Sequence, residues 1–181
     1  VDMDGKQAFE KACTYLAGLG HRRIALLNGE PGFMFPVGCR EGYESGLFLS
    51  GLELDPDLIR VWKHKDPSQS SYRWTLELFK NDNPPTAILF QTEAVNGIFK
   101  GLDELDLQPG KDVALIGYDD LEIARIHRPS LSVLRPQARE AGQRVVNILM
   151  EVINGEDPGK FQEIHQVEMV IRETSLSLIH I

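Results

Sequence analysis

Apolar residues recur along the chain at two spacings, one typical of helices and one typical of buried strands. Side chains three and four positions apart form one helical face at Phe9, Ala12, Cys13, Leu16 and Leu19. Gly20 then provides a left-handed helix stop. The run IALLNG that follows is apolar on both faces, as the central strand of a parallel sheet requires. The pattern therefore predicts a helix followed by a buried strand.

The same alternation of helix and strand continues along the chain. We expect helices at residues 38–50, 72–79 and 95–105, after a loop rich in glycine, proline and phenylalanine at 29–38. We expect strands at 24–28, 58–62, 86–90 and 112–117. Short connections between alternating helices and strands make the strands parallel, with helices on both faces of the sheet. The predicted fold class is therefore a three-layer α/β/α lobe.

The pattern changes after Pro129. LSVLRP is typical of a short strand, and a long amphipathic helix follows with its apolar face at Ala138, Ala141, Val145, Ile148, Leu149 and Val152. The stretch FQEIHQVEMVIRET at 161–174 gives the longest strand signal, but the strand expected at 162–174 has no obvious neighbour. An unpaired strand edge recruits another chain, so we expect this segment to be poorly ordered or to pair with a second copy.

Composition narrows the classes of function. The chain has 181 residues, 42% of them hydrophobic, with a net charge of −8. An acidic protein repels phosphate backbones, so this chain alone is a poor nucleic-acid binder. No apolar stretch approaches membrane-spanning length and the first residues do not resemble a signal peptide, so no membrane partner is expected. Cys13 and Cys39 have no metal-ligand spacing, which favours buried free thiols and a cytoplasmic location.

Sequence motifs for catalysis are missing. Gly18-Leu19-Gly20 resembles the start of a dinucleotide fingerprint, but it follows a helix and Arg23 occupies the third glycine position. The sequence has no P-loop, nucleophile elbow, Cys-x-x-Cys pair or His-Glu-x-x-His motif, and its histidines are scattered. We therefore expect no cofactor, no metal and no catalytic residue.

Two adjacent carboxylates, Asp119 and Asp120, directly follow the fourth predicted strand. Ligands of parallel α/β sheets bind beyond the carboxyl ends of the strands, so both residues lie on the expected ligand edge. Neighbouring side chains at a strand end point in different directions, which disfavours an acid–base pair that shares a proton. One carboxylate could cap a short helix at 121–126 while the other faces a cleft.

Arg40 and several aromatic residues are further candidates for this edge. Arg40 lies near the first turn of its predicted helix among small residues that permit close approach of a ligand, although a surface ion pair would explain it equally well. Aromatic faces stack on sugar rings and charged groups hydrogen-bond to hydroxyls, so the set suits a small polyhydroxyl or anionic ligand. The aromatic candidates are Phe33, Phe35, Trp62 and Tyr72.

Several segments, taken in order, resemble the LacI/GalR transcription regulators. They are GHRRIALLNG, GCREGYESGL, PPTAILF, DVALIGYDDLEIARIHRPSLSVLRPQAREAGQRVVNILMEVINGE and VIRETS, and the resemblance extends from Asp4 to Ser175. It implies a periplasmic-binding-protein-like domain whose two lobes close on a small-molecule effector. Residues 1–128 would form the C-terminal effector-binding lobe, and 129–181 would return to a second, incomplete N-terminal lobe. A DNA-binding headpiece would precede Val1.

The resemblance also assigns roles by position. Arg40 in CREGY and Asp119 in GYDD would contact the effector, and Asp120 would be a turn and cap residue. Members of the family usually carry Asn-Asp after the strand that corresponds to residues 86–90. This chain has FQTEAVNG there, and Thr92 or Glu93 could take the place of the asparagine. Family members dimerise through both lobes, so a homodimer is expected, with the apolar helix at 121–126 as a contact candidate.

Three functions remain in competition. The leading one is a sensor domain of a LacI-type regulator, which binds a sugar or related metabolite and alters operator binding. A solute-binding protein of a transport system shares the fold and is the alternative. An enzyme that uses Asp119 and Asp120 has no nucleophile or metal set to support it. The upstream sequence, the oligomeric state and the fate of a bound sugar would separate the three.

Overall fold

The computed structural model describes residues 1–32, 34–62 and 66–175 and contains a six-stranded sheet in the order β3-β2-β4-β5-β6-β8. All neighbouring strands are parallel except β6 and β8, which are antiparallel. The four strands expected between residues 24 and 117 are all present and parallel, which confirms the predicted fold class. The strands are β2 (Ile24–Gly29), β3 (Ile59–Trp62), β4 (Ala87–Gln91), β5 (Ala114–Tyr118), β6 (Ser132–Pro136) and β8 (Val167–Val170).

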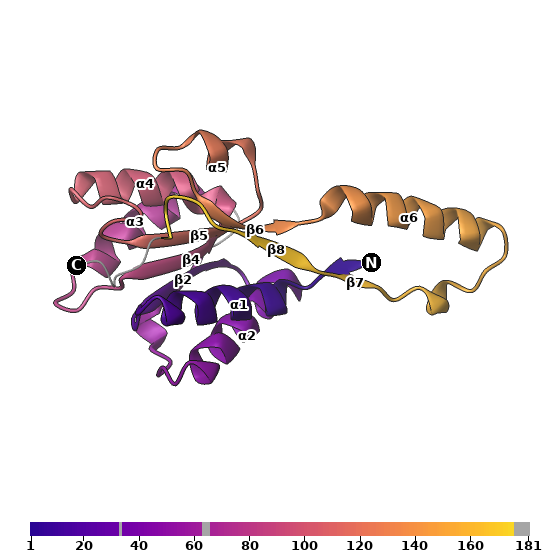
Figure 1. Cartoon of the computed structure of the whole chain (residues 1–181), viewed down its shortest axis with the longest axis horizontal. Coiled ribbons are helices and arrows are strands. Elements are labelled where there is room, and N and C mark those ends of the chain that lie inside the picture. The colour runs from indigo at the N-terminus through magenta and orange to yellow at the C-terminus, as the bar shows by residue number, and fades with distance from the viewer. Residues whose placement is uncertain (33, 63–65, 176–181) are drawn as a thin grey trace.

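Helices cover both faces of this sheet (Figure 1). On one face are α1 (Gly5–Gly18) and α2 (Met34–Leu49), and on the other are α3 (Pro67–Phe79), α4 (Val95–Glu104) and the short α5 (Glu122–Ile126). Single-turn 3₁₀ helices lie at Pro56–Leu58, Thr92–Ala94 and Pro158–Lys160. The chain therefore has the three layers that the sequence pattern predicts.

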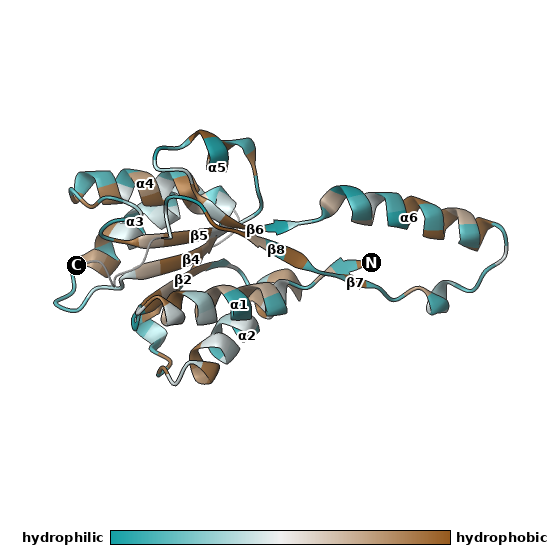
Figure 2. Cartoon of the chain, viewed as in Figure 1, coloured by the Kyte–Doolittle hydropathy of each residue, from teal (hydrophilic) through white to brown (hydrophobic). Residues whose placement is uncertain are grey.

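The two faces of the sheet hold separate hydrophobic cores, because successive side chains of a strand point to opposite sides. In β2, Ile24 and Leu26 pack with α1 and α2, whereas Ala25 and Leu27 pack toward α3 and α4. Figure 2 shows the central strands as the most hydrophobic part of the lobe. Burial on both sides explains why these strands are continuous apolar runs.

Helix α2 begins at Met34, so the prediction of a loop through residue 38 is wrong at its end. Pro36 lies in the first turn of the helix, where its missing N–H would have no helical acceptor. The buried Asn28 amide donates a 2.7 Å hydrogen bond to the Pro36 carbonyl and fixes this turn beside the end of β2.

The last strand segment is paired within the chain, contrary to the expectation for residues 162–174. It divides into β7 (Ile164–His165), which pairs in parallel with β1 (Asp2–Met3), and β8, which pairs with β6. Beyond β8, the Thr174 hydroxyl donates to the Leu115 carbonyl and accepts from the Ser132 N–H. The sequence pattern missed this because β6 and the first residues of the chain provide the neighbours.

The long helix α6 (Ala138–Ile153) projects away from the six-stranded sheet, together with β1 and β7 (Figure 1). The expected division at residue 128/129 stays a prediction; of the segment after it, β6 and β8 are strands of the six-stranded sheet. The chain passes from β6 into α6, and it returns through β7 into β8. Arg144 ties α6 to the returning chain through a bidentate ion pair with Glu163.

Two further expectations concern the helices. Cys13 and Cys39 are free and buried, and burial raises the pKa of the Cys13 thiol to about 12. Across the described part of the chain, no helix combines the length and the apolar character needed to cross a bilayer.

Candidate functional site

A cleft of about 320 Å³ lies at the carboxyl ends of the parallel strands. Gln91 and Tyr118 reach it from the ends of β4 and β5, and Asp119 follows directly. Phe35 enters from the first turn of α2. The remaining lining comes from Asp2, Met3, Glu93, Pro136 and Ala138. The cleft thus occupies the edge at which parallel α/β sheets bind ligands.

Asp119 is held at the cleft by its backbone. Its φ of 82° is in the left-handed region that few non-glycine residues adopt. Its N–H donates to the Leu134 carbonyl at 2.9 Å, and its carbonyl accepts from the Thr92 hydroxyl at 3.1 Å. A Cβ on Gly117 would lie 2.7 Å from that hydroxyl, so the close approach requires glycine. A strained conformation fixed from two sides is common at functional sites.

The cleft is acidic. Burial, and then the negative charge of Glu93, raise the pKa of Asp119 above its ordinary value. Asp2 is a third carboxylate in the lining, and no lysine, arginine or histidine is among the lining residues that the structure describes. Burial, followed by the charge of Asp119, also raises the pKa of Tyr118. The groups offered to a ligand are therefore carboxylates, an amide and a neutral phenol.

Aromatic and amide side chains form the wall of the cleft. The Phe35 and Tyr118 rings are tilted by 60° with centroids 4.6 Å apart. The Gln91 amide donates to the Asn28 side-chain carbonyl at 3.0 Å, and the same Asn28 holds the Phe35 turn through Pro36. These contacts fix the wall without using the whole hydrogen-bonding capacity of Gln91, since its carbonyl oxygen can still accept.

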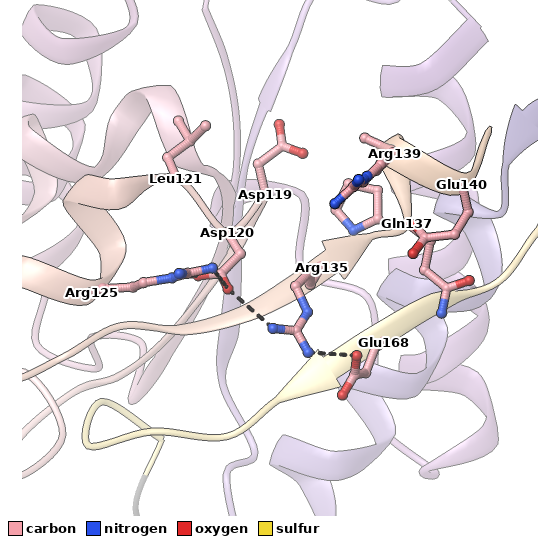
Figure 3. A pocket seen from close by; sticks show the side chains of 11 residues that line it. Asp119, Asp120, Leu121, Arg125, Arg135, Gln137, Arg139, Glu140 and Glu168 are labelled. Atoms are coloured by element: carbon pink, nitrogen blue, oxygen red, sulfur yellow. Dashed lines mark hydrogen bonds and ion pairs between the residues drawn. The ribbon is translucent and has the colours of Figure 1, made fainter. Parts of the chain in front are cut away.

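Asp120 is not a helix cap, which corrects the sequence interpretation. The N-terminal cap of α5 is Leu121, and no side chain accepts a hydrogen bond there. The Asp120 carboxylate, 3% exposed, instead pairs with Arg125, Arg135 and Arg172. In Figure 3 it turns toward Arg125 while the Asp119 carboxylate points elsewhere, so the two adjacent acids do not form a pair.

Of the other predicted site residues, Phe35 and Glu93 line the cleft with Asp119. Thr92 contributes through its hydroxyl, which donates to the Asp119 carbonyl. Arg40 is not among the lining residues. It lies on the exposed side of α2, its side chain is 52% exposed, and its Nε donates to Glu44 at 2.8 Å. The surface ion pair considered for Arg40 is therefore what the structure contains.

Tyr72 and Trp62 also lie outside the cleft. Tyr72 is on α3, where its hydroxyl donates to Glu104 and Lys100 lies over its ring. Trp62 is buried and stacks with Trp74. Phe33 lies outside the described residues. Of the three aromatic candidates that the structure describes, Phe35 alone lines the cleft.

Sequence reasoning missed Gln91, Tyr118 and the N-terminal Asp2 and Met3 as lining residues. The signal for Gln91 and Tyr118 was available, because each directly follows a predicted strand at the expected edge. Asp2 and Met3 carry no such signal, since they reach the cleft only through the pairing of β1 with β7.

The described residues contain no group of three or more His, Cys, Asp or Glu side chains placed to hold a metal ion.

A neighbouring cavity of about 450 Å³ shares Asp119, Pro136 and Ala138 with the cleft and extends over Asp120, Arg135 and Arg139 (Figure 3). The arrangement as a whole has the features of a binding site for a polar organic molecule.

Comparison with known proteins agrees with a domain that binds small molecules. A family model described as "Periplasmic binding protein-like domain" matches residues 13–175. The chain therefore belongs to this family, in the form found in LacI-type transcription regulators, and corresponds to the C-terminal part of their effector domain.

Individual relatives place it more closely. The chain is 30% identical over 181 residues to the HTH-type transcriptional regulator AglR of Rhizobium meliloti (strain 1021), covering 97% of this chain and 50% of that protein. A regulatory protein of the LacI family from Chloroflexus aggregans matches with a TM-score of 0.90 and 28% identity, over 97% of this chain and 63% of the other. A sugar-binding LacI-family regulator from Escherichia coli, solved with phosphate, gives 0.86 and 25%, over 97% and 62%. The chain thus spans about half the length of the curated relatives it matches.

Proposed function

We propose that this chain is the ligand-sensing part of a LacI-type transcription regulator, and that a neutral sugar or related polyhydroxyl metabolite binds at Asp119. The observation that carries the proposal is the fixed, strained position of Asp119 in a cleft at the strand ends. A carboxylate and an amide accept hydrogen bonds from hydroxyl groups, and the Phe35 and Tyr118 rings offer apolar faces to a sugar ring.

The charge of the lining separates the two ligand classes that the sequence left open. Asp2, Glu93 and Asp119 would repel a phosphorylated or carboxylated ligand, and no cation of the described lining offsets them. The Escherichia coli relative is a sugar-binding regulator, which agrees with a sugar as the ligand class here. Relatives that act as regulators favour this function over the transport and enzyme alternatives.

The assembly follows from the same assignment. We propose a cytoplasmic homodimer in which sugar binding changes operator affinity through a DNA-binding segment outside this chain. Leu121 and Ile126, at the start and end of α5, are 47% and 63% exposed, which supports this helix as a dimer contact. Two-fold dimers match two-fold operators.

The test is calorimetry on the full-length protein with glucose, galactose, maltose, cellobiose and glucose 6-phosphate. We expect at least one neutral sugar to bind and the phosphate ester to bind far more weakly. Asp119→Asn should weaken sugar binding by about ten- to a hundredfold, since hydrogen bonds to charged groups are worth ~1.5–3 kcal/mol.

Tyr72→Phe is the matched control, because Tyr72 lies outside the cleft and should not affect affinity. Equal affinity in wild type and Asp119→Asn would refute the site, and tighter binding of the phosphate ester would refute the ligand class.

A further inference from the structure

Asp120 joins three separate parts of the lobe beside the cleft. Its Oδ2 lies 2.7 Å from Arg125 on α5 and 3.5 Å from Arg135 on β6, and its Oδ1 lies 2.8 Å from Arg172, just after β8. Hydrogen bonds between ionised groups are about twice as strong as neutral ones. A single buried carboxylate therefore holds α5, β6 and the end of β8 together.

This cluster is directly connected to the cleft. Asp120 follows Asp119, and the Asp119 N–H is bonded to Leu134 of β6, next to Arg135. Figure 3 shows Asp119 and Asp120 diverging from one turn, with Asp120 directed toward the guanidinium groups. A rotation of this turn caused by a ligand at Asp119 must also move the Asp120 carboxylate.

The arginine on β6 is the partner that such a rotation would affect first. Arg135 lies opposite Glu168 of β8 in the strand register, and its Nη2 donates to that carboxylate at 2.7 Å. Its contact with Asp120 is the longest of the three that Asp120 makes with arginines. Arg135 is thus shared between two carboxylates and can pass from one to the other with small movements.

Strands β6 and β8 are the route to the rest of the molecule. The chain leaves the sheet through Pro136 to α6 and returns from β7 to β8 (Figure 1). A change in the contacts of Arg135 with Asp120 and Glu168 would alter the position of β6 relative to β8 where both strands leave the lobe. Coupling between distant sites requires an element of this kind, with two arrangements of similar energy.

We propose that Asp120 is a positioning residue that transmits occupancy of the cleft at Asp119 to strands β6 and β8 through Arg135. The proposal rests on the proposed function, because it needs a ligand that binds at Asp119. It differs from a purely structural role, which would stabilise the lobe equally with and without ligand.

The experiment uses hydrogen exchange and calorimetry on the full-length protein, with each neutral sugar named above as the probe. Asp120→Asn removes the charge with little change in shape, and Arg135→Gln removes the shared partner. Asp55→Asn is the matched control: it breaks the 3.0 Å ion pair of Asp55 with Arg23, which precedes β2 and lies at the opposite end of the sheet.

We expect sugar to slow amide exchange in β6 and β8 of the wild type. In Asp120→Asn and Arg135→Gln this slowing should be lost, while sugar affinity changes by less than about tenfold, or 1.4 kcal/mol. Asp55→Asn should retain both. Unchanged slowing in Asp120→Asn, or an equal loss in Asp55→Asn, would overturn the proposal. Should Asp120→Asn fail to fold, Arg135→Gln decides alone, since the Arg135 side chain is 40% exposed.

A second measurement needs no ligand and separates this proposal from the proposed function. If no sugar binds the wild type, the proposed function fails, and urea unfolding of Asp119→Asn, Arg135→Gln and their combination still tests the coupling. We expect the effects on the unfolding equilibrium constant to deviate from their product by at least about twofold. Adding Asp120→Asn should abolish the deviation. Independent effects in the protein that retains Asp120 would overturn the coupling.

Discussion

Replacing Asp119 by glycine should separate the stability of the lobe from its ability to bind a ligand. The φ of 82° strains any residue with a Cβ, by about 1–2 kcal/mol in the left-handed region. Glycine removes that strain but gains about 0.5–1 kcal/mol of flexibility in the unfolded chain. The strain term is the larger of the two, so Asp119→Gly should raise the free energy of unfolding, by about 1 kcal/mol.

Asp119→Ala removes the same carboxylate but retains the strain. The glycine variant should therefore be more stable than the alanine variant, by about 1 kcal/mol. Both variants should lose sugar affinity by about ten- to a hundredfold, because both lack the charged hydrogen-bond acceptor. Urea unfolding gives the first quantity, and calorimetry on the full-length protein gives the second.

Asp106 provides the control for this comparison. It has the same residue type and a φ of 55°, but it is exposed after the end of α4 and does not line the cleft. Asp106→Gly should also be more stable than Asp106→Ala, with sugar affinity unchanged in both. An alanine variant at Asp119 as stable as the glycine variant would refute the argument from strain. Retained sugar affinity in both Asp119 variants would refute its role in binding.

Two further predictions concern pH and packing. Because the folded-state pKa of Asp119 is raised, the stability it contributes is present below its ordinary value of 3.8 and lost as pH rises through the raised one. Asp119→Asn should thus be more stable than wild type at neutral pH in urea unfolding, and the advantage should vanish in acid. Gly97→Ala should lower the free energy of unfolding by about 2–3 kcal/mol through overpacking, because the added Cβ would lie 1.9 Å from the Ser68 carbonyl oxygen. At Gly142 no atom lies within 4 Å of an added Cβ, so Gly142→Ala should instead raise the free energy of unfolding. Equal effects at the two sites would contradict this account of the packing.

The helical periodicity of the sequence was enough to predict that Arg40 is exposed. Cys39, Tyr43 and Leu47 recur every four residues on one face of α2, and all three are buried. Arg40 is one residue beyond Cys39 and therefore about 100° around the helix, on the exposed side. The resemblance to the family placed Arg40 at the effector, whereas the helical phase places it on the exposed side of α2, where the structure pairs it with Glu44.

Local spacing along the chain was enough to predict the strands, the two cores and the position of Asp119. Buried strands of a parallel sheet are apolar on both faces, so their residues are recognisable without knowledge of their neighbours. All parallel strands end on one edge, so the residue after β5 reaches the ligand edge whatever the rest of the chain does. These features depend on residue order and connection length alone.

The role of Asp120 and the pairing of the last strand depend instead on how the folded lobe packs. The partners of Asp120 lie at Arg125, Arg135 and Arg172, and local spacing predicts none of the more distant contacts. The alternation in residues 162–174 shows that a strand needs neighbours, but not that β6 and β1 supply them. Ion pairs and strand pairing join residues far apart in the chain, so their partners are set by how the layers come together.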